Sequence, residues 1–447
     1  MHTQDRRWLA LYVLCAGELM IVLDTTVVNV ALPSIRQDLG FSEASLVWVV
    51  NAYMLTYGGF LLLGGRLGDL YGKRRLFLAG TAFFTLASLA CGLATSPAFL
   101  VVARAVQGLG GAVVSAIALS LIMDLFTGAA ERAKAMGVYG FVCAGGGSLG
   151  VLLGGGLTST LGWHWVFLVN LPIGAAVVAL CAWLLPKDGE TARGQLDVAG
   201  AVLITASLLL AVYGIVNGPR VLLVAAAALL ALFLVVESRV RHPLMPLRLL
   251  RVRSLAVGNV VGALWAAAMF AWFFVAALYL QMALGYDPFQ VGLAFLPSNL
   301  IMAAFSIGLS AMMVMRFGLR APIALGLALA AAGLALFALA PGNGTFWIHV
   351  LPGMLLLGVG CGMALNPVML AVMGEVAPAE SGLASGIANT AFMMGGALGL
   401  AVLASLASVH GYYLAFAIGA AFAAVAALLG GILLRESSER SEAWATP

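Results

Sequence analysis

Long apolar segments alternate with short polar ones along almost the entire chain, and this alternation predicts a membrane protein. Apolar runs of roughly 18 or more residues are long enough to cross a bilayer as helices. The predicted fold class is therefore an all-α membrane protein with about fourteen transmembrane helices. These are expected at residues 8–32, 46–65, 76–95, 98–123, 135–158, 163–185, 198–217, 220–237, 255–282, 290–314, 321–340, 345–370, 381–404 and 411–434.

The composition supports the same class and argues against several functions. Hydrophobic residues make up 63% of the chain and charged residues 9%, whereas soluble domains carry roughly 25% charged residues. The net charge of +4 is too small to indicate a nucleic-acid partner. The five cysteines fall in apolar runs without metal or disulfide spacing. The chain contains no P-loop, so no nucleotide-driven pump is expected. It also has no cluster with metal-ligand spacing and no nucleophile elbow, so no enzyme, metal or cofactor is expected.

Basic residues predict the orientation in the cell membrane. With the N-terminus inside, 19 of the 22 Lys and Arg residues fall in inside segments, while Arg36 and Arg220 fall outside and Arg104 lies within a span. Because basic residues favour the cytoplasmic side, an even number of spans with both termini in the cytoplasm is expected. The first apolar run is too long and too acidic for a signal peptide, so we interpret it as a retained span.

A weak internal repeat predicts two related halves. Residues 65–72 follow the second span, and the similar residues 315–320 follow the tenth. Two six-helix halves with a substrate path between them near the midplane is a transporter plan. We expect an N-terminal half at 1–185, two inserted linker helices with cytoplasmic connectors at 186–253, and a C-terminal half with a short cytoplasmic tail at 254–447.

The loop at residues 65–75 is a candidate conformational latch. Its glycines allow a tight turn between antiparallel helices, and Asp69 can accept hydrogen bonds from a nearby arginine or a helix N-terminus. An ion pair formed in one conformation and broken in the other would act as a latch; alternatively, the basic loop only sets topology. The residues assigned to the latch are Gly65, Arg66, Gly68, Asp69, Gly72, Lys73 and Arg74.

Two carboxylates, Glu18 and Asp24, lie inside the first span. A charge there costs at least ~2.5–3.5 kcal/mol, and burial disfavours the charged form of a carboxyl group. Asp24 is therefore the first candidate for proton coupling or cation binding; the alternative is a structural acid that Arg104 or Asn29 hydrogen-bonds. Glu18 lies about 120° around the helix from Asp24, so the two acids are not expected to share one partner.

The other candidates around the first span each have a plainer alternative. Arg104, within a span, should pair with an acid, a carbonyl group or water. Glu18 lies on a partly polar stripe with Asn29 that could face a cavity, or it is simply protonated in place. The candidates for proton coupling or substrate binding are thus Asp24, Glu18, Arg104 and Asn29.

Aromatic residues in the second and ninth spans are candidates for the wall of a substrate cavity. Aromatic rings suit flat lipophilic or cationic ligands through stacking and cation–π contact. The alternative is that they face lipid or belong to the interfacial belts. The candidates are Tyr53, Tyr57, Trp265, Phe270 and Trp272.

These motifs resemble those of a known family. Residues 65–75 resemble the cytoplasmic signature of the major facilitator superfamily, G-x-L-[AG]-D-x-x-G-[RK]-[RK]. The segment LDTTVVNVALP at 23–33 is similar to a signature of the fourteen-span drug:proton antiporters within it. The resemblance covers nearly the whole chain, because further motifs match at 104–112, 154–157, 163–174 and 382–390.

The resemblance implies the major facilitator fold and a role for Arg104 in proton transfer. The chain departs from the pattern in the fifth span, where Gly150-Val151 replaces the usual Gly-Pro pair. Gly146, Gly150 and Gly154 still leave one helix face bare for close packing. Without the proline the kink is expected to be weaker, which bears on the direction of antiport and not on the fold.

The predicted function is proton-coupled export of a lipophilic drug or an antibiotic by alternating access, as in multidrug efflux and antibiotic resistance. The acidic residues favour a cationic substrate, and the protein is expected to work as a monomer in the bilayer. The alternative is a facilitator or symporter of a small nutrient, which Val151 favours and the fourteen-span plan disfavours. A membrane enzyme or a receptor without transport is disfavoured, because the sequence contains no catalytic set and no soluble signalling domain.

Overall fold

The computed structural model describes residues 3–186, 188, 197–240, 243–341, 344–376 and 380–434, and the regular structure in this part of the chain is helical. Thirteen of the described helices are long and apolar enough to cross a membrane. A shorter apolar helix, Pro288–Ala304, continues through two further helical segments to Phe317 and completes another span. The expected all-α membrane protein with about fourteen spans is confirmed.

The helices follow the predicted spans closely. The first group is α1 (Thr3–Leu39), α2 (Trp48–Tyr71), α3 (Lys73–Gly92), α4 (Pro97–Leu125), α5 (Ala129–Leu161), α6 (Trp165–Leu168) and α7 (Asn170–Leu184). Two helices follow, α8 (Val198–Asn217) and α9 (Arg220–Arg239). The last group is α10 (Arg253–Leu278), α11 (Pro288–Ala304), α12 (Ser310–Phe317), α13 (Arg320–Ala338), α14 (Leu351–Met373), α15 (Ser381–His410) and α16 (Tyr412–Leu433). Short 3₁₀ helices are η1 (Ser45–Val47) and η2 (Leu247–Arg251). Short π-helices are η3 (Tyr279–Ala283), η4 (Phe305–Leu309) and η5 (Phe346–Val350).

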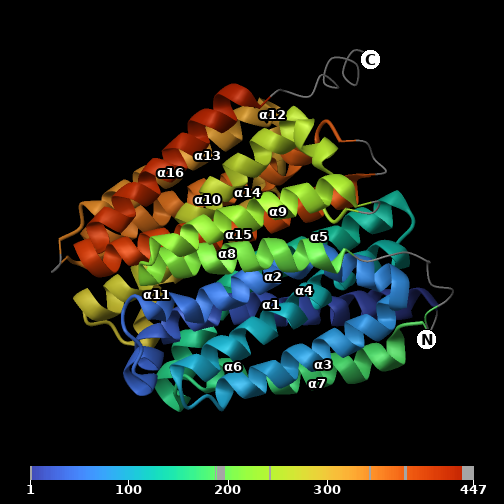
Figure 1. The fold of residues 1–447 in the computed structure, drawn as a ribbon, viewed down its shortest axis with the longest axis horizontal. Helices are drawn as coiled ribbons and strands as arrows, with labels where there is room; N and C mark the ends of the chain where they lie inside the picture. The colour runs from blue at the N-terminus through green and yellow to red at the C-terminus, as the bar shows by residue number, and fades with distance from the viewer. Residues whose placement is uncertain are drawn as a thin grey trace.

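The helices pack mainly within two groups (Figure 1). In the first, α4 packs on α2 and α3, and α1 packs on α5 and α7. In the second, α10 packs on α15 and α16, and α13 packs on α14 and α16. The groups meet where α5 contacts α11 and where α2 contacts α15, and α8 lies over the second of these seams with α9 beside it. The domain boundaries 1–185, 186–253 and 254–447 stay a prediction.

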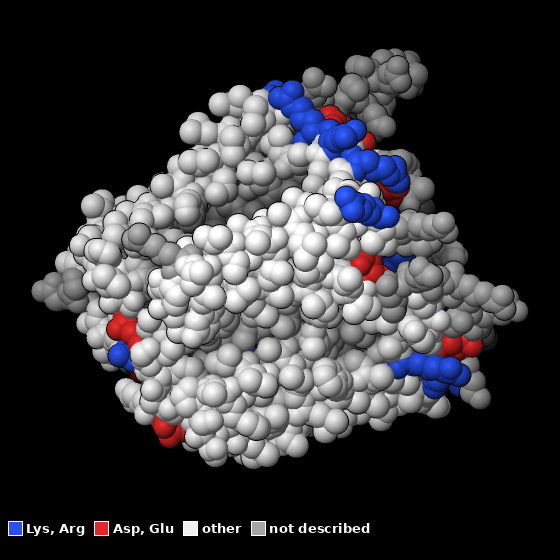
Figure 2. All heavy atoms as spheres, viewed as in Figure 1, with Lys and Arg blue, Asp and Glu red and all other residues white. Residues whose placement is uncertain are grey.

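The two ends of the bundle differ in charge. We call the end where α1 begins and α16 ends the terminal face, and the opposite end the distal face (Figure 1). Lysine and arginine side chains gather at the terminal face, whereas the long apolar middle of the molecule shows almost none on the visible side (Figure 2). This is the charge distribution expected of a bundle that spans a membrane.

Local sequence signals explain several helix ends. Gly72, at φ 97°, lies between α2 and α3 and adopts a backbone conformation that residues other than glycine rarely adopt. Pro97 occupies the first turn of α4, where its missing N–H group is not needed, and the Ser96 side chain accepts a hydrogen bond from Phe99 N–H. Asp287 and Gln290 form a capping box at the start of α11.

The glycines of α5 allow it to approach α1 closely. A Cβ atom at Gly150 would lie 1.9 Å from Thr26 Oγ1, and one at Gly154 would lie 2.6 Å from Val27 O. Gly146 faces Val22 of α1 in the same way. In lipid, helix association depends on such close packing because apolar burial alone gives little advantage there.

The seam between α5 and α11 is tightly packed near the distal face. At the distal end, a Cβ atom at Gly155 would lie 2.5 Å from Pro288 O. The same face of α5 continues toward the terminal end through Gly147, Gly140 and Gly137, where a Cβ atom would have nothing within 4 Å. α5 and α11 therefore pack most closely near the distal face, and η4 also contacts α5.

Two hydrogen bonds also join the groups away from this seam. Gln281 Nε2 donates to Val30 O over 3.0 Å, which links η3 to α1 near the distal face. Asn51 Nδ2 donates to Ala397 O over 3.1 Å, which links α2 to α15.

Replacing Gly154 with alanine should destabilise the protein by about 1–3 kcal/mol, because the added methyl group meets the α1 backbone. Gly147→Ala is the matched control, since the same group is added to the same helix where space is open. Thermal unfolding of the detergent-purified variants measures the difference. Equal melting temperatures for the two variants would contradict the close packing of α1 on α5.

Candidate functional site

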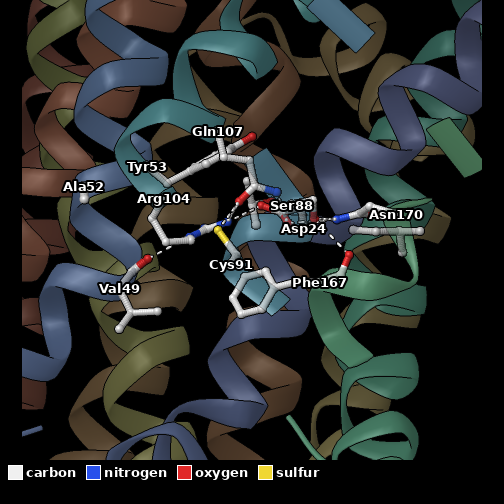
Figure 3. A network of polar contacts seen from close by, with 12 residues as sticks. Asp24, Val49, Ala52, Tyr53, Ser88, Cys91, Arg104, Gln107, Phe167 and Asn170 are labelled. Atoms are coloured by element: carbon white, nitrogen blue, oxygen red, sulfur yellow. Dashed lines mark hydrogen bonds and ion pairs between the residues drawn. The ribbon is translucent and has the colours of Figure 1, made fainter. Parts of the chain in front are cut away.

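Asp24 is the centre of a buried polar network (Figure 3). Its side chain is fully buried in α1 and forms an ion pair with Arg104 of α4. Oδ1 accepts hydrogen bonds from Gln107 Nε2 at 2.7 Å and from Asn170 Nδ2 at 3.0 Å. Asp24 is thus held by residues from α4 and α7, and the pairing with Arg104 was one of the two alternatives that the sequence left open.

Arg104 is held by several further groups. Its Nε atom donates to Val49 O at 2.9 Å, and Nη1 also donates to Gln107 Oε1 at 2.7 Å. The guanidinium carbon lies 4.3 Å from the centre of the Tyr53 ring and 5.5 Å from that of Phe167. Aromatic faces stabilise a cation electrostatically and exclude water from it. The Nη2 atom has no hydrogen-bond partner among the described residues.

The network continues into α3 and α6. Asn170 Nδ2 also donates to Ser88 Oγ at 2.9 Å, and Ser88 Oγ donates to Phe167 O at 2.9 Å. Cys91 Sγ donates to Gln107 Oε1 at 3.4 Å. One connected set of polar side chains therefore fixes α1, α2, α3, α4, α6 and α7 relative to one another.

Glu18 lies in a different environment on the same helix. Its side chain is 5% exposed, and the side chains facing it are Ser115 of α4 and Tyr139 of α5. Tyr57 of α2 and Cys143 of α5 also border it. No described Lys or Arg forms an ion pair with it, and Oε2 has no hydrogen-bond partner in the described part of the chain. The two acids of α1 therefore have separate partners, as their angular separation predicts.

Asn29 does not join the Asp24 network. Its amide donates to Thr25 O of its own helix at 3.3 Å, so the alternative in which Asn29 holds Asp24 is wrong. The side chain is buried, at 7% exposure.

The loop between α2 and α3 is tied to three neighbouring elements. Lys73 Nζ contacts Asp124 Oδ2 of α4 at 2.7 Å, and Arg74 Nη2 donates to Ala182 O of α7 at 2.6 Å. Asp188 accepts hydrogen bonds from the Arg74 and Arg75 N–H groups at 2.8 and 3.1 Å. Asp188 thus binds the N-terminus of α3, where an anion is favoured.

The remaining latch residues are only partly placed. Arg66 is exposed, and Gly68 packs beside Ile117 of α4. Gly65 lies near Ala116, and Gly72 forms the turn itself. The side chain of Asp69, on which the latch hypothesis depends, lies outside the described residues.

The candidate cavity aromatics divide into two kinds. Tyr53, Trp265 and Trp272 are almost fully buried, so they have nearly no surface toward an open space. Tyr57 stacks on Tyr53 with ring centres 5.8 Å apart and borders Glu18. Phe270 of α10 packs against α15, where its ring centre lies 5.9 Å from that of Phe392, and near Met54 of α2. It therefore lies where the two groups meet.

Several residues of these clusters were not singled out by sequence reasoning. Gln107 and Asn170 both fall within the matched motifs. Gln107 also lies one helical turn from Arg104, so the sequence could have indicated that it belongs to the same polar face. Ser88, Ser115 and Tyr139 carry no such signal, because single hydroxyl groups are common in membrane helices and only the packing places these near an acid.

Comparison with known proteins shows the family of the chain. The family model described as Major Facilitator Superfamily matches residues 14–365 and 260–444. The puromycin resistance protein pur8 of Streptomyces alboniger is 39% identical, covering 98% of this chain and 93% of the relative. The cephamycin export protein CmcT of Amycolatopsis lactamdurans is 41% identical, covering 88% and 84%. The lincomycin resistance protein of Streptomyces lincolnensis is 37% identical, covering 90% and 84%.

Solved structures share the fold at low sequence identity. A D-xylose–proton symporter superposes with a TM-score of 0.69 at 17% identity, covering 96% of this chain and 98% of the other. An auto-inhibited peptide transporter of the POT family gives 0.68 at 18% identity, covering 95% and 96%. The family model, the relatives and the helical architecture together establish that the chain belongs to the major facilitator superfamily.

Proposed function

We propose that the protein exports a lipophilic drug or an antibiotic across the cell membrane in exchange for protons, by alternating access. Relatives at 37–41% identity are named for resistance to puromycin and lincomycin and for export of cephamycin, which supports a small antibiotic as cargo. The observation that carries the coupling is Glu18, a buried carboxyl group without a cationic partner among the described residues.

The orientation follows from charge. Because Lys and Arg gather at the terminal face (Figure 2), we place this face and both termini in the cytoplasm. The close contact between α5 and α11 then lies on the outward side. We propose that a monomer suffices, because one chain supplies both helix groups and the residues between them.

Asp24 is assigned a structural role in this proposal, although it was the first candidate for proton coupling. A cationic substrate could compete for Asp24 only by displacing Arg104, which would leave a buried arginine without its counter-charge. Breaking a buried pair on one side costs about 3–5 kcal/mol. The pair, with Gln107 and Asn170, instead keeps the first helix group rigid while the groups move.

Glu18 is assigned the proton-coupling role because it has no such counter-charge. An isolated charge in an apolar interior is costly, so the site requires a bound proton or a cation. A cationic substrate and a proton would compete for the carboxyl group, which couples release of one to entry of the other. The hydroxyl groups of Ser115, Tyr57 and Tyr139 can hydrogen-bond whichever form is present.

The loop at 65–75 is proposed as the cytoplasmic latch. Its contacts with Asp124, Ala182 and Asp188 fix the start of α3 to neighbouring helices and to the segment after α7. A rigidly held loop can form or release contacts as a unit when the groups rock against each other.

Asp24→Asn should lower the stability of the purified protein by about 3–5 kcal/mol, since Arg104 would remain buried and charged. The double variant Asp24→Leu with Arg104→Met removes both charges and should recover a large part of this loss. Thermal unfolding in detergent compares the three proteins. A single variant as stable as the wild type would show that the ion pair does not hold the helix group together.

Glu18→Gln should abolish transport driven by a pH gradient, because an amide neither binds nor releases a proton in the working range. Uptake of a fluorescent lipophilic cation into inside-out vesicles under an imposed gradient measures this, with neutral and anionic antibiotics tested in parallel. Glu18→Asp keeps the acid on a shorter side chain and should retain part of the activity.

The outcomes separate the two parts of the proposal. If the wild type moves no compound in a gradient-dependent way, export itself is wrong. If the wild type does so and Glu18→Gln is unchanged, the export assignment stands and the proton is carried elsewhere.

A further inference from the structure

A second pair of buried acids lies in the inserted helices, away from the Asp24 network. Asp197 precedes α8 and is 7% exposed, and Glu237 lies in the last turn of α9 and is 3% exposed. A Cβ atom at Gly200 would lie 2.5 Å from Glu237 Oε1 and 2.7 Å from Asp197 Oδ2. The two carboxyl groups therefore border the same small space, which the missing side chain of Gly200 leaves open.

Backbone N–H groups approach three of the four carboxyl oxygens of the pair. Gly200 N–H donates to Asp197 Oδ1 at 2.8 Å, which caps α8. Met245 N–H donates to Glu237 Oε2 at 3.0 Å, and Leu244 N–H lies 3.4 Å from Asp197 Oδ2. Both acids thus bind the connector that leads from α9 toward α10.

Glu237 Oε1 is left without a hydrogen-bond partner in the described part of the chain. Asp197 is the side chain within reach of it. Two carboxylates have no hydrogen to share, so their oxygens would repel each other instead of bonding. A single proton between them would satisfy the orphaned oxygen and remove one of the two buried charges.

No described basic side chain neutralises the pair. Arg239 of α9 and Arg66 of α2 are exposed, and no ion pair joins either of them to Asp197 or Glu237. Arg248 of the connector pairs with Glu380 at the start of α15. Leu244, whose N–H group approaches Asp197, packs in an apolar cluster with Leu63, Leu67 and Ala201.

A metal ion fits this site less well than a proton. Hard cations take six or more oxygen ligands, whereas three of the groups that face these carboxyls are N–H donors, from Gly200, Leu244 and Met245. Such donors stabilise a single negative charge, which is what a carboxyl–carboxylate pair with one proton carries.

We propose that Asp197 and Glu237 share one proton at neutral pH and that this protonated pair clamps the α9–α10 connector to the base of α8. The site is distinct from the transport pathway and binds a proton for a structural purpose.

The position of the connector gives the clamp a consequence. Leu244 packs on Leu63 of α2 and Ala201 of α8, in the first helix group and the inserted pair. Leu249, five residues later, packs with Ala384 and Ile387 of α15 in the last group. The connector therefore bridges the two groups at the terminal face, and loss of the shared proton would weaken one end of the bridge.

The sign of the pH effect follows from proton counting. In the unfolded chain both acids are ionised above about pH 5. A folded protein that keeps one proton between them loses stability as pH rises, by up to about tenfold in the folding equilibrium per pH unit. Glu237→Gln should remove this contribution, because its amide group can donate to Asp197 while its carbonyl oxygen accepts from Met245 N–H.

The experiment is thermal unfolding of the full-length protein in detergent between about pH 6 and 9. The wild type should lose stability with rising pH more steeply than Glu237→Gln, and the variant should be at least as stable at the alkaline end. Glu380→Gln is the matched control, since it removes an acid that binds the same connector through Arg248 and should keep the wild-type pH dependence.

A spectroscopic measurement tests the proton directly. The infrared difference spectrum of wild type minus Glu237→Gln at neutral pH should contain the carbonyl stretch of one protonated carboxylic acid. A spectrum without this band, or a Glu237→Gln variant with the pH dependence of the wild type, would overturn the proposal. A Glu237→Gln variant that is destabilised equally at all pH values would also overturn the proposal. The amide would then have replaced a carboxylate that is charged throughout this pH range.

Discussion

A fully buried ion pair, between Asp24 and Arg104, is the interaction around which the first helix group is organised. Two charges removed from water are tolerated when most of their remaining hydrogen-bonding capacity is satisfied. Gln107, Asn170 and the Val49 carbonyl group supply those hydrogen bonds from three different helices. The requirement to satisfy one ion pair therefore fixes the relative positions of helices that are far apart in the sequence.

Small residues allow the helices of this arrangement to approach one another closely. Gly150 and Gly154 bring α5 into backbone contact with α1, and Gly155 brings the same helix against α11 near the distal face. Toward the terminal face, Gly147 and Gly140 have space beside them. A rigid first group that meets the second along helix seams can move against it as a unit, which is the motion that alternating access requires.

Four buried acids have three different environments, although the side chains are chemically alike. Asp24 has an arginine partner, Glu18 has hydroxyl neighbours and no basic partner among the described residues, and Asp197 faces Glu237. The neighbours, and not the acid itself, decide whether it holds a helix group together, exchanges a proton or shares one. A transporter can thus place structural and functional carboxyl groups six residues apart on one helix, as in α1.

The sequence by itself determined the features that depend on the solvent. Apolar runs set the number and ends of the membrane helices, and the family signatures identified the fold, because both follow from local composition and spacing. The tertiary structure alone decided which polar groups meet. Nothing local relates Asn170 to Asp24 or Tyr139 to Glu18, and Asn29, a nearer candidate, bonds its own helix instead. Pairing across helices depends on how each helix is rotated and where its glycines let another approach, and these are properties of the packed bundle.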